Sequence, residues 1–351
     1  MKQVRLQKKQ YLRFFSAFSS VILFLVTAFV SWCMAGLLHS QYAAERWKGD
    51  SETAFAQVSV FRRGNAEFST ASIPPLHESI EDALKTASLE AGTDTRLWYD
   101  AYSTQAGQTE ITGKRRNPAK AAVTVVGGDF FLLHALKFTN GSPFSDNDLM
   151  HDKVVIDSQL AWQLFGSSHV EGMEVTIQNQ TCLVSGVVSP ESDYASKTAY
   201  GDTGRIYISY DFYQTYFDSE NTEEISCYEA VLPNPVRGFA QKTITEAIGT
   251  DDDSLLIIQN TDRFSLSNRW KNLKGIRKLI LSENISYPYW ENAAKIISFD
   301  TSVLLLIEIL FLIWPVFYLI FLLWKGYRLA ERILWEKRTA FKNRYRSQIH
   351  V

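Results

Sequence analysis

Two long stretches without charge constrain this chain more than any other feature of its sequence. Residues 14–38 contain no charged side chain, and residues 301–324 contain only one, Glu308. A helix needs roughly 20 apolar residues to cross the hydrocarbon core of a bilayer, and both stretches exceed that length. The first also exceeds the roughly 7 to 15 apolar residues of a secretory signal. We therefore expect two membrane-spanning helices, an uncleaved one over residues 14–38 and a second over residues 298–324.

The charges beside the two spans predict their orientation. Residues 1–13 carry five Lys or Arg and no acid, whereas residues 325–351 carry eight Lys or Arg against two Glu. Because basic flanks stay in the cytoplasm, both termini are expected inside and residues 39–297 outside. The outer segment holds 23 basic and 34 acidic side chains, a net charge of −11. Such an acidic domain is not expected to bind nucleic acid.

Within the outer segment, short β-branched and aromatic runs alternate with runs of helical spacing. The order strand, helix, strand occurs twice, over residues 56–102 and again over residues 225–259. Between them, residues 123–188 contain strand and helix periods in close succession. Two βαβ halves can pair into one ferredoxin-like sheet. We therefore predict an α+β domain with ferredoxin-like βαβ halves and an inserted α/β subdomain that includes residues 123–188.

The individual elements follow from local signals. Ser158 is expected to cap a helix that ends at Gly166, and Asn234 with Pro235 to form the cap and first turn of the helix over 239–248. The remaining predicted strands and helices are 56–62, 73–88, 97–102, 123–126, 154–156, 173–177, 181–188, 207–217 as a strand followed by a helix, 225–232 and 255–259.

Ordinary catalytic and metal-binding motifs do not occur in the sequence. It has no GxxxxGK[ST], no HExxH and no GxSxG. The acidic loop that contains Asp146, Asp148, His151 and Asp152 lacks the glycine and the terminal glutamate of a calcium-binding loop. We therefore expect a protein that is not an enzyme, with no catalytic, cofactor-binding or metal-binding residues.

The two cysteines of the outer segment leave two alternatives. A disulfide between Cys182 and Cys227 suits an extracytoplasmic compartment. Two separate buried thiols on strands are equally consistent with the pattern.

Two features of the second span can contribute to function. Glu308 falls near the middle of the span, where an ionised side chain is costly unless it meets a partner or water. It is either a coupling residue or a structural hydrogen-bonding group. Pro315 removes a backbone donor seven residues later and is a candidate kink.

The segment after the second span is predicted to be a basic amphipathic helix. Ala330, Leu334, Phe341 and Tyr345 share one apolar stripe, and Arg328, Arg332, Lys337 and Arg338 are the candidate coupling residues around it. Such a helix suits an anionic lipid surface or an acidic groove on a partner.

The stretch from Val123 to Val188 also carries a family resemblance. It contains, in order, GGDFF, a GSPFS turn, KVVIDSQLAWQLFG, EGMEVTI and LVSGVV. This order resembles the extracytoplasmic core domain of MacB-like ABC transporter permeases. The resemblance implies a bacterial plasma-membrane protein, a porter-like part with an inserted second part, and a cytoplasmic segment after the second span that contacts an ATPase.

The resemblance covers both spans and the outer domain but not the last two FtsX-like spans of the family. It therefore implies a truncated two-span form that works with an ABC ATPase, an FtsX-like permease subunit and membrane lipid, as a homodimer or a heterodimer. The expected function is a non-catalytic subunit that couples the ATPase to the outer domain for export or mechanical work. Two alternatives share this topology: a polysaccharide chain-length regulator, whose outer domain has mainly long helices, and an extracytoplasmic sensor subunit.

Overall fold

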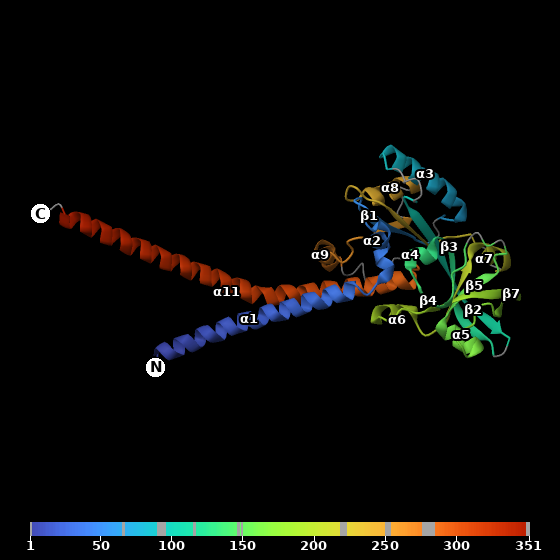
Figure 1. The fold of residues 1–351 in the computed structure, drawn as a ribbon, viewed down its shortest axis with the longest axis horizontal. Coiled ribbons are helices and arrows are strands. Elements are labelled where there is room, and N and C mark those ends of the chain that lie inside the picture. Colours follow the sequence, from blue (N-terminus) through green and yellow to red (C-terminus); the bar gives the residue numbers. More distant parts are fainter. Residues whose placement is uncertain are drawn as a thin grey trace. The chain divides into compact units, whose positions relative to one another are not determined.

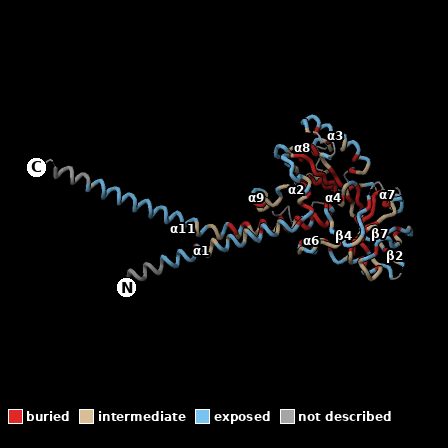
Figure 2. Tube along the Cα trace, in the orientation of Figure 1, coloured by how far each residue is buried: buried red, intermediate tan, exposed pale blue. Residues whose placement is uncertain are grey.

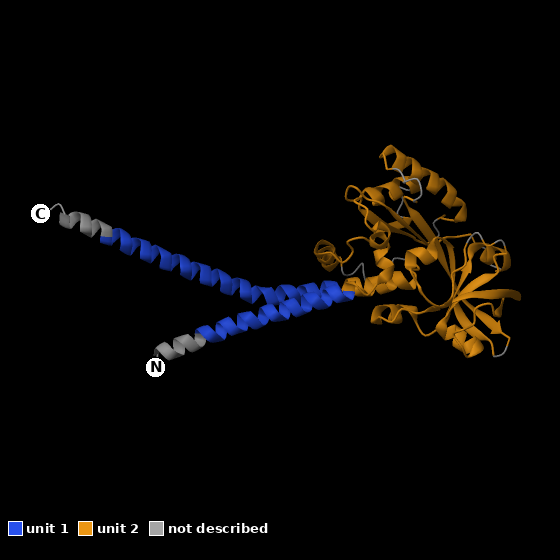
Figure 3. Cartoon of the chain, viewed as in Figure 1, with its two compact units in different colours: residues 1–34, 300–351 blue, residues 35–299 orange. Residues whose placement is uncertain are grey.

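The chain forms two compact units in a computed structural model (Figure 3). The first, here called the helix pair, comprises Met1–Met34 and Asp300–Val351, and the second, here called the sheet unit, comprises Ala35–Phe299. The structure describes residues 2–64, 67–89, 96–114, 117–145, 148, 150–217, 223–249, 254–275 and 285–348.

The sheet unit is built around one sheet of ten strands (Figure 1). The strands are β1 (Phe55–Arg62), β2 (Tyr99–Gly113), β3 (Ala119–Gly128), β4 (Lys137–Gly141), β5 (Lys153–Asp157), β6 (Glu174–Ile177), β7 (Gln180–Ser189), β8 (Arg205–Ser209), β9 (Cys227–Pro233) and β10 (Leu255–Gln259). Their order is β10-β1-β9-β2-β3-β8-β5-β7-β4, and β6 pairs with β2 and β7.

Short helices cover both faces of this sheet. They are η1 (His39–Tyr42), α2 (Ala43–Lys48), η2 (Thr70–Ser72), α3 (Ile73–Thr86), α4 (Phe130–His134), α5 (Ser158–Phe165), α6 (Tyr194–Tyr200), α7 (Tyr210–Tyr216), α8 (Phe239–Ile248) and α9 (Leu266–Lys274). There are also two longer helices, α1 (Lys2–Ala35) and α11 (Tyr289–Gln348). Helix α11 contains the second predicted span, whereas α1 ends three residues before the predicted end of the first, at residue 38.

Four strands form the ferredoxin-like sheet that the sequence predicts. The halves β1-α3-β2 and β9-α8-β10 interleave in the order β10-β1-β9-β2, and each neighbouring pair is antiparallel. β1 alternates its side chains between two apolar cores, with Val58 and Val60 in the core under α3 and α8 and Phe61 in the core under α2 and the start of α11. The predicted mixed α+β fold is confirmed.

The inserted part does not form a separate sheet, because β2 is far longer than the predicted strand over 97–102. Its first residues pair with β9 and its last three with β6, while β3 pairs with it from Ala101 to Ile111, so one sheet runs through both parts. A register shift between Gln105 and Gln108 interrupts the pairing with β3. This second half contains mostly polar, partly exposed residues, so it lacks the apolar alternation that marks a strand in a sequence.

Two predicted helix caps are wrong in detail. Asp157, not Ser158, caps α5, because its Oδ1 accepts a hydrogen bond from Leu160 N at 2.7 Å. Gly238 is the N-cap of α8, so Asn234 and Pro235 precede the helix. Asn234 Oδ1 nevertheless accepts from Ala240 N at 3.2 Å, so its side chain serves the first turn from outside it.

The two outer cysteines are separate thiols. Cys182 on β7 and Cys227 on β9 are both free and buried, and burial raises the pKa of Cys182 to about 12. In the acidic loop, Asp148 pairs with Lys153 and His151 contacts Asp211, while Asp146 lies outside the described residues. Among the residues that the structure describes, no three His, Cys, Asp or Glu side chains are grouped to hold a metal ion.

The helix pair has the composition of membrane-spanning helices. Segments Gln10–Ala35 and Tyr289–Ala340 are long and apolar enough to cross a membrane. Most of their large apolar side chains are exposed in the chain by itself, as the pale blue helices of Figure 2 show. Exposed apolar surface of this extent suits a lipid environment.

Candidate functional site

Glu308 is buried between α1 and α11 in the helix pair. Its side chain is only 3% exposed, and its Oε1 accepts a hydrogen bond from Ser31 Oγ on α1 at 2.7 Å. Ser31 is itself 4% exposed. The acidic side chain of the second span therefore faces a hydroxyl of the first span, which is how a polar group in a membrane helix is normally accommodated.

Pro315 lies within α11, and the helix continues through it. Proline has no backbone N–H, so the carbonyl four residues earlier, that of Phe311, loses its usual donor. Ser20 Oγ on α1 donates a hydrogen bond to this carbonyl at 2.6 Å. The first span thus supplies the hydrogen bond that Pro315 removes, a compensation that membrane helices commonly use.

Sequence reasoning missed the polar face of α1. Ser16, Ser20, Thr27 and Ser31 recur at spacings of four, seven and four residues, which places them on one helical face. Of these, Ser16 Oγ accepts a hydrogen bond from Trp314 Nε1 on α11 at 3.0 Å. Small polar residues on one face of a span are a recognised signal for helix pairing, so this seam was detectable from the sequence.

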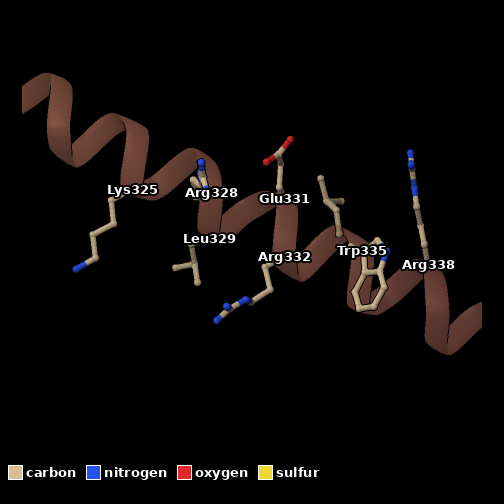
Figure 4. A pocket seen from close by; sticks show the side chains of 8 residues that line it. Lys325, Arg328, Leu329, Glu331, Arg332, Trp335 and Arg338 are labelled. Carbon is tan, nitrogen blue, oxygen red and sulfur yellow. The ribbon is translucent and has the colours of Figure 1, made fainter.

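The candidate coupling residues after the second span surround α11 instead of forming one basic face. Lys337 follows Arg328 by nine positions, which at 3.6 residues per turn places it about 180° around the helix. Figure 4 shows Arg332 on one side of the helix and Glu331 with Arg338 on the other. The predicted apolar stripe is exposed at Ala330 and Leu334. The side chains of Phe341 and Tyr345 lie outside the described residues.

Local contacts stiffen the first turns of this segment. The guanidinium of Arg328 lies 4.8 Å from the ring centre of Trp324, a cation–π contact. Tyr327 Oη donates to Glu331 Oε1 at 3.0 Å. The structure does not bring Arg328 or the later basic residues to Glu308, because twenty helical residues separate Glu308 from Arg328 by about 30 Å.

The sheet unit holds the start of α11 through a buried ion pair that sequence reasoning also missed. Arg263, in the loop after β10, donates to both carboxylate oxygens of Glu291, from NH1 to Oε2 at 2.7 Å and from NH2 to Oε1 at 2.6 Å. Arg263 also donates to Gln41 in η1 and to Ser298 on α11, each at 3.2 Å. This Arg263 clamp ties together the chain that leaves α1 and the chain that enters α11.

A second buried cluster lies around Glu229 on β9. Its Oε1 accepts from Ser59 Oγ at 3.0 Å, and its Oε2 accepts from Trp290 Nε1 at 3.1 Å. His134 Nε2 lies 2.9 Å from the same Oε2 as an ion-pair contact. Trp290, on the first turn of α11, is therefore bound directly to the central strand of the ferredoxin-like sheet.

The electrostatics of this cluster favour an ionised Glu229. Burial by itself would raise the pKa of Glu229, but the charge of His134 and hydrogen bonds from His134, Ser59 and Trp290 together lower that pKa below its usual range. The nearby Glu191 is different, because burial outweighs the charge of His134 and raises its pKa. Through Trp290 this cluster anchors the first turn of α11 to the ferredoxin-like sheet.

Residues 35–267 match the family model described as the MacB-like periplasmic core domain, which is about two thirds of the chain. The chain belongs to this family. The MacB-like domain begins where α1 ends and extends into α9, so it comprises nearly all of the sheet unit. The protein is thus a membrane protein whose MacB-like periplasmic domain, of the type found in ABC transporter permeases, is flanked by two long apolar helices.

Three solved structures resemble the MacB-like domain. The periplasmic region of MacB from Actinobacillus actinomycetemcomitans is 15% identical with a TM-score of 0.41, over 66% of this chain and 94% of that one. The extracellular domain of the noncanonic ABC-type transporter YknZ from Gram-positive bacteria is 14% identical with a TM-score of 0.37, over 57% and 99%. A domain of a putative permease protein from Porphyromonas gingivalis is 12% identical with a TM-score of 0.33, over 58% and 88%. No curated protein matches the chain.

Proposed function

We propose that this protein is a non-catalytic subunit of a MacB-like ABC transport system. It couples a cytoplasmic ATPase and an FtsX-like partner permease to its outer domain, for export or for mechanical work outside the membrane. Residues 14–38 and 298–324 are the spans in this proposal, residues 39–297 are extracytoplasmic, and residues 1–13 and 325–351 are cytoplasmic.

One observation carries the proposal: α11 is a single helix of 60 residues from the buried core of the MacB-like domain to the basic tail. At 1.5 Å per residue it measures about 90 Å. Its first turn is fixed by the Arg263 clamp and by the hydrogen bond from Trp290 to Glu229. A displacement of the tail by an ATPase therefore has a continuous helix along which to reach the domain.

The candidate residues have distinct roles in this proposal. The basic tail residues Arg328, Arg332, Lys337 and Arg338 contact the ATPase from more than one side, because they surround the helix. Glu308 holds α11 to α1 through Ser31, and Pro315 provides a bend whose free carbonyl is satisfied by Ser20. In this proposal α1 and residues 300–324 of α11 move together, while the tail after residue 324 responds to the ATPase.

The test compares two tails of equal net charge. One full-length variant reverses Arg332, Lys337 and Arg338 to Glu, and the other reverses Lys342, Arg344 and Arg346. Each is purified from its native membranes, and the ATP hydrolysis that co-purifies with it is measured against wild type. We expect the first variant to lose the ATPase, or to uncouple hydrolysis from transport, and the second to retain both.

A purely lipid-binding tail gives a different result. Each basic residue then contributes similarly, on the order of 1 kcal/mol near an anionic surface, and the effect follows total charge. Equal ATPase recovery and transport with the two tails would refute a positional coupling role. Hydrogen exchange of the outer domain in both variants serves as the folding control.

A further inference from the structure

Helix α9 exposes an apolar and basic face that the core of the sheet unit does not use. Leu266 is 66% exposed and Trp270 is 48% exposed, although both are large apolar residues. Lys271 and Lys274 are also exposed, and the ammonium of Lys274 lies 6.0 Å from the ring centre of Trp270. Leu266, Trp270 and Lys274 recur every four residues, so they share one side of the helix.

The opposite side of α9 faces the protein. Arg269 is 7% exposed, and Asn268 Nδ2 donates to Asp262 O at 2.8 Å. Ser265 caps the helix by accepting from Asn268 N. These contacts fix the rotation of α9 about its own axis, so its apolar and basic face points away from the core.

Hydrogen bonds from the loop before α9 fix the place in the sheet unit at which this helix begins. Asn260 donates from its backbone N to Gln57 O at 2.8 Å and from Nδ2 to Ser59 Oγ at 2.8 Å, which fixes the loop to β1. Arg263 fixes the same loop to Glu291 and Ser298 of α11. Leu266 follows Arg263 by three residues, a reach of at most about 10 Å.

The apolar run of α11 begins close to this loop. Ser298 precedes the apolar run that begins at residue 301 by only three residues, about 5 Å along the helix axis. Because Arg263 donates a hydrogen bond to Ser298, the loop that leads into α9 lies beside the residue that precedes this run. Tryptophan and lysine are residue types that membrane proteins place at the membrane–water boundary.

The charge of α9 is opposite to that of the domain that carries it. Its exposed face carries Lys271 and Lys274 and its nine residues contain no acidic side chain, whereas residues 39–297 together have a net charge of −11. A basic island at the membrane end of an acidic domain is complementary to an anionic surface.

We propose that α9 docks on anionic phospholipid of the outer leaflet. Leu266 and Trp270 enter the headgroup boundary, while Lys271 and Lys274 contact lipid phosphates. Docking holds the MacB-like domain at a set height above the bilayer and gives the start of α11 a support that does not depend on the ATPase. Loss of ATPase binding would therefore leave this surface intact.

The test measures how fast a water-soluble maleimide labels a cysteine on this face. Full-length protein carrying Cys33→Ala and Ser267→Cys is placed in nanodiscs of phosphatidylcholine alone or of phosphatidylcholine mixed with phosphatidylglycerol. Ser267 is exposed beside Leu266, and the matched control is Ser79→Cys, which is exposed on α3. We expect phosphatidylglycerol to slow labelling at position 267 and to leave position 79 unchanged.

Charge reversal identifies the cause. Lys271→Glu with Lys274→Glu should restore fast labelling in anionic nanodiscs, with about a fivefold effect for each lysine. Trp270→Ser should restore it in part, because the apolar contribution is lost. Equal labelling at position 267 in the two lipid mixtures, or slow labelling that persists after charge reversal, would overturn the proposal.

Discussion

The same helix, α11, is held by different chemistry in the two units of the molecule. In the sheet unit its first turn is fixed by a bidentate ion pair from Arg263 to Glu291 and by the hydrogen bond from Trp290 to Glu229. In the helix pair, single hydroxyl groups reach α11 from α1, as Ser31 does to Glu308 and Ser20 to Phe311 O.

The two kinds of contact differ in the free energy that each contributes to stability. Breaking a buried ion pair on one side costs about 3 to 5 kcal/mol, because the remaining charge stays buried. A single hydrogen bond between membrane helices contributes on average about 0.6 kcal/mol. The ion pair at the domain end of α11 is therefore expected to contribute more to stability than either hydroxyl contact in the helix pair.

The largest effect is expected at the Arg263 clamp. Arg263→Met should lower the free energy of unfolding of the MacB-like domain by about 3 to 5 kcal/mol, since Glu291 is then buried without its bidentate partner. The double variant Arg263→Met with Glu291→Leu should recover much of that loss. Chemical denaturation of the full chain in micelles measures both. As a control, Glu246→Ala removes an exposed partner of Lys242 and should cost no more than about 0.5 kcal/mol.

Glu308 is expected to affect activity more than folding. If coupling requires an ionisable group, Glu308→Gln and Glu308→Leu should both abolish ATP-dependent transport while the complex still assembles. Ser31→Ala, which removes the contacting hydroxyl but keeps the carboxyl group, should act more weakly. Wild-type activity in the Gln variant would reduce Glu308 to a structural hydrogen-bonding group.

The smallest effect is expected at the carbonyl that Pro315 leaves free. Ser20→Ala should weaken the association of α1 with α11 by on the order of 1 kcal/mol, because Phe311 O then has no donor from α1. In a Pro315→Ala background the backbone supplies its own donor, so Ser20→Ala should cost almost nothing. Equilibrium unfolding of the four proteins in mixed micelles gives this double-mutant cycle. Additive effects would show that the two residues act independently.

The sequence predicted the domain better than the anchors of α11. The ferredoxin-like halves were recognisable because periodicity and turns are local signals, and residues such as Leu76, Ile80 and Leu84 mark one helical face. The long second half of β2 was not, because its polar residues have no apolar alternation. The predicted N-cap is one residue from the observed cap at Ser158 and four residues from it at Asn234. Helix ends are less clearly marked in a sequence than the helices themselves.

Some of the functional contacts could also be predicted from the sequence, and others could not. Glu308 and Pro315 were evident as exceptions in an apolar run, and the small-residue face of α1 offered a signal for their partners. Arg263 and Glu291 offered none, because their pairing depends on how the loop after β10 folds back on α11. Sequence spacing also suggested a basic side to the tail, whereas the helix distributes Arg328 and Lys337 to opposite sides.

The most direct test of the account is to interrupt α11 after it leaves the membrane. Four glycines inserted after Lys325 make the helix flexible there, and four alanines inserted at the same point keep it helical. The measurement is the ATP-dependent change in hydrogen exchange of residues 260–265, in each protein bound to its ATPase. Transmission through α11 predicts a change in wild type and in the alanine variant, and none in the glycine variant. An equal ATP response in the glycine variant, or no response in wild type, would contradict it.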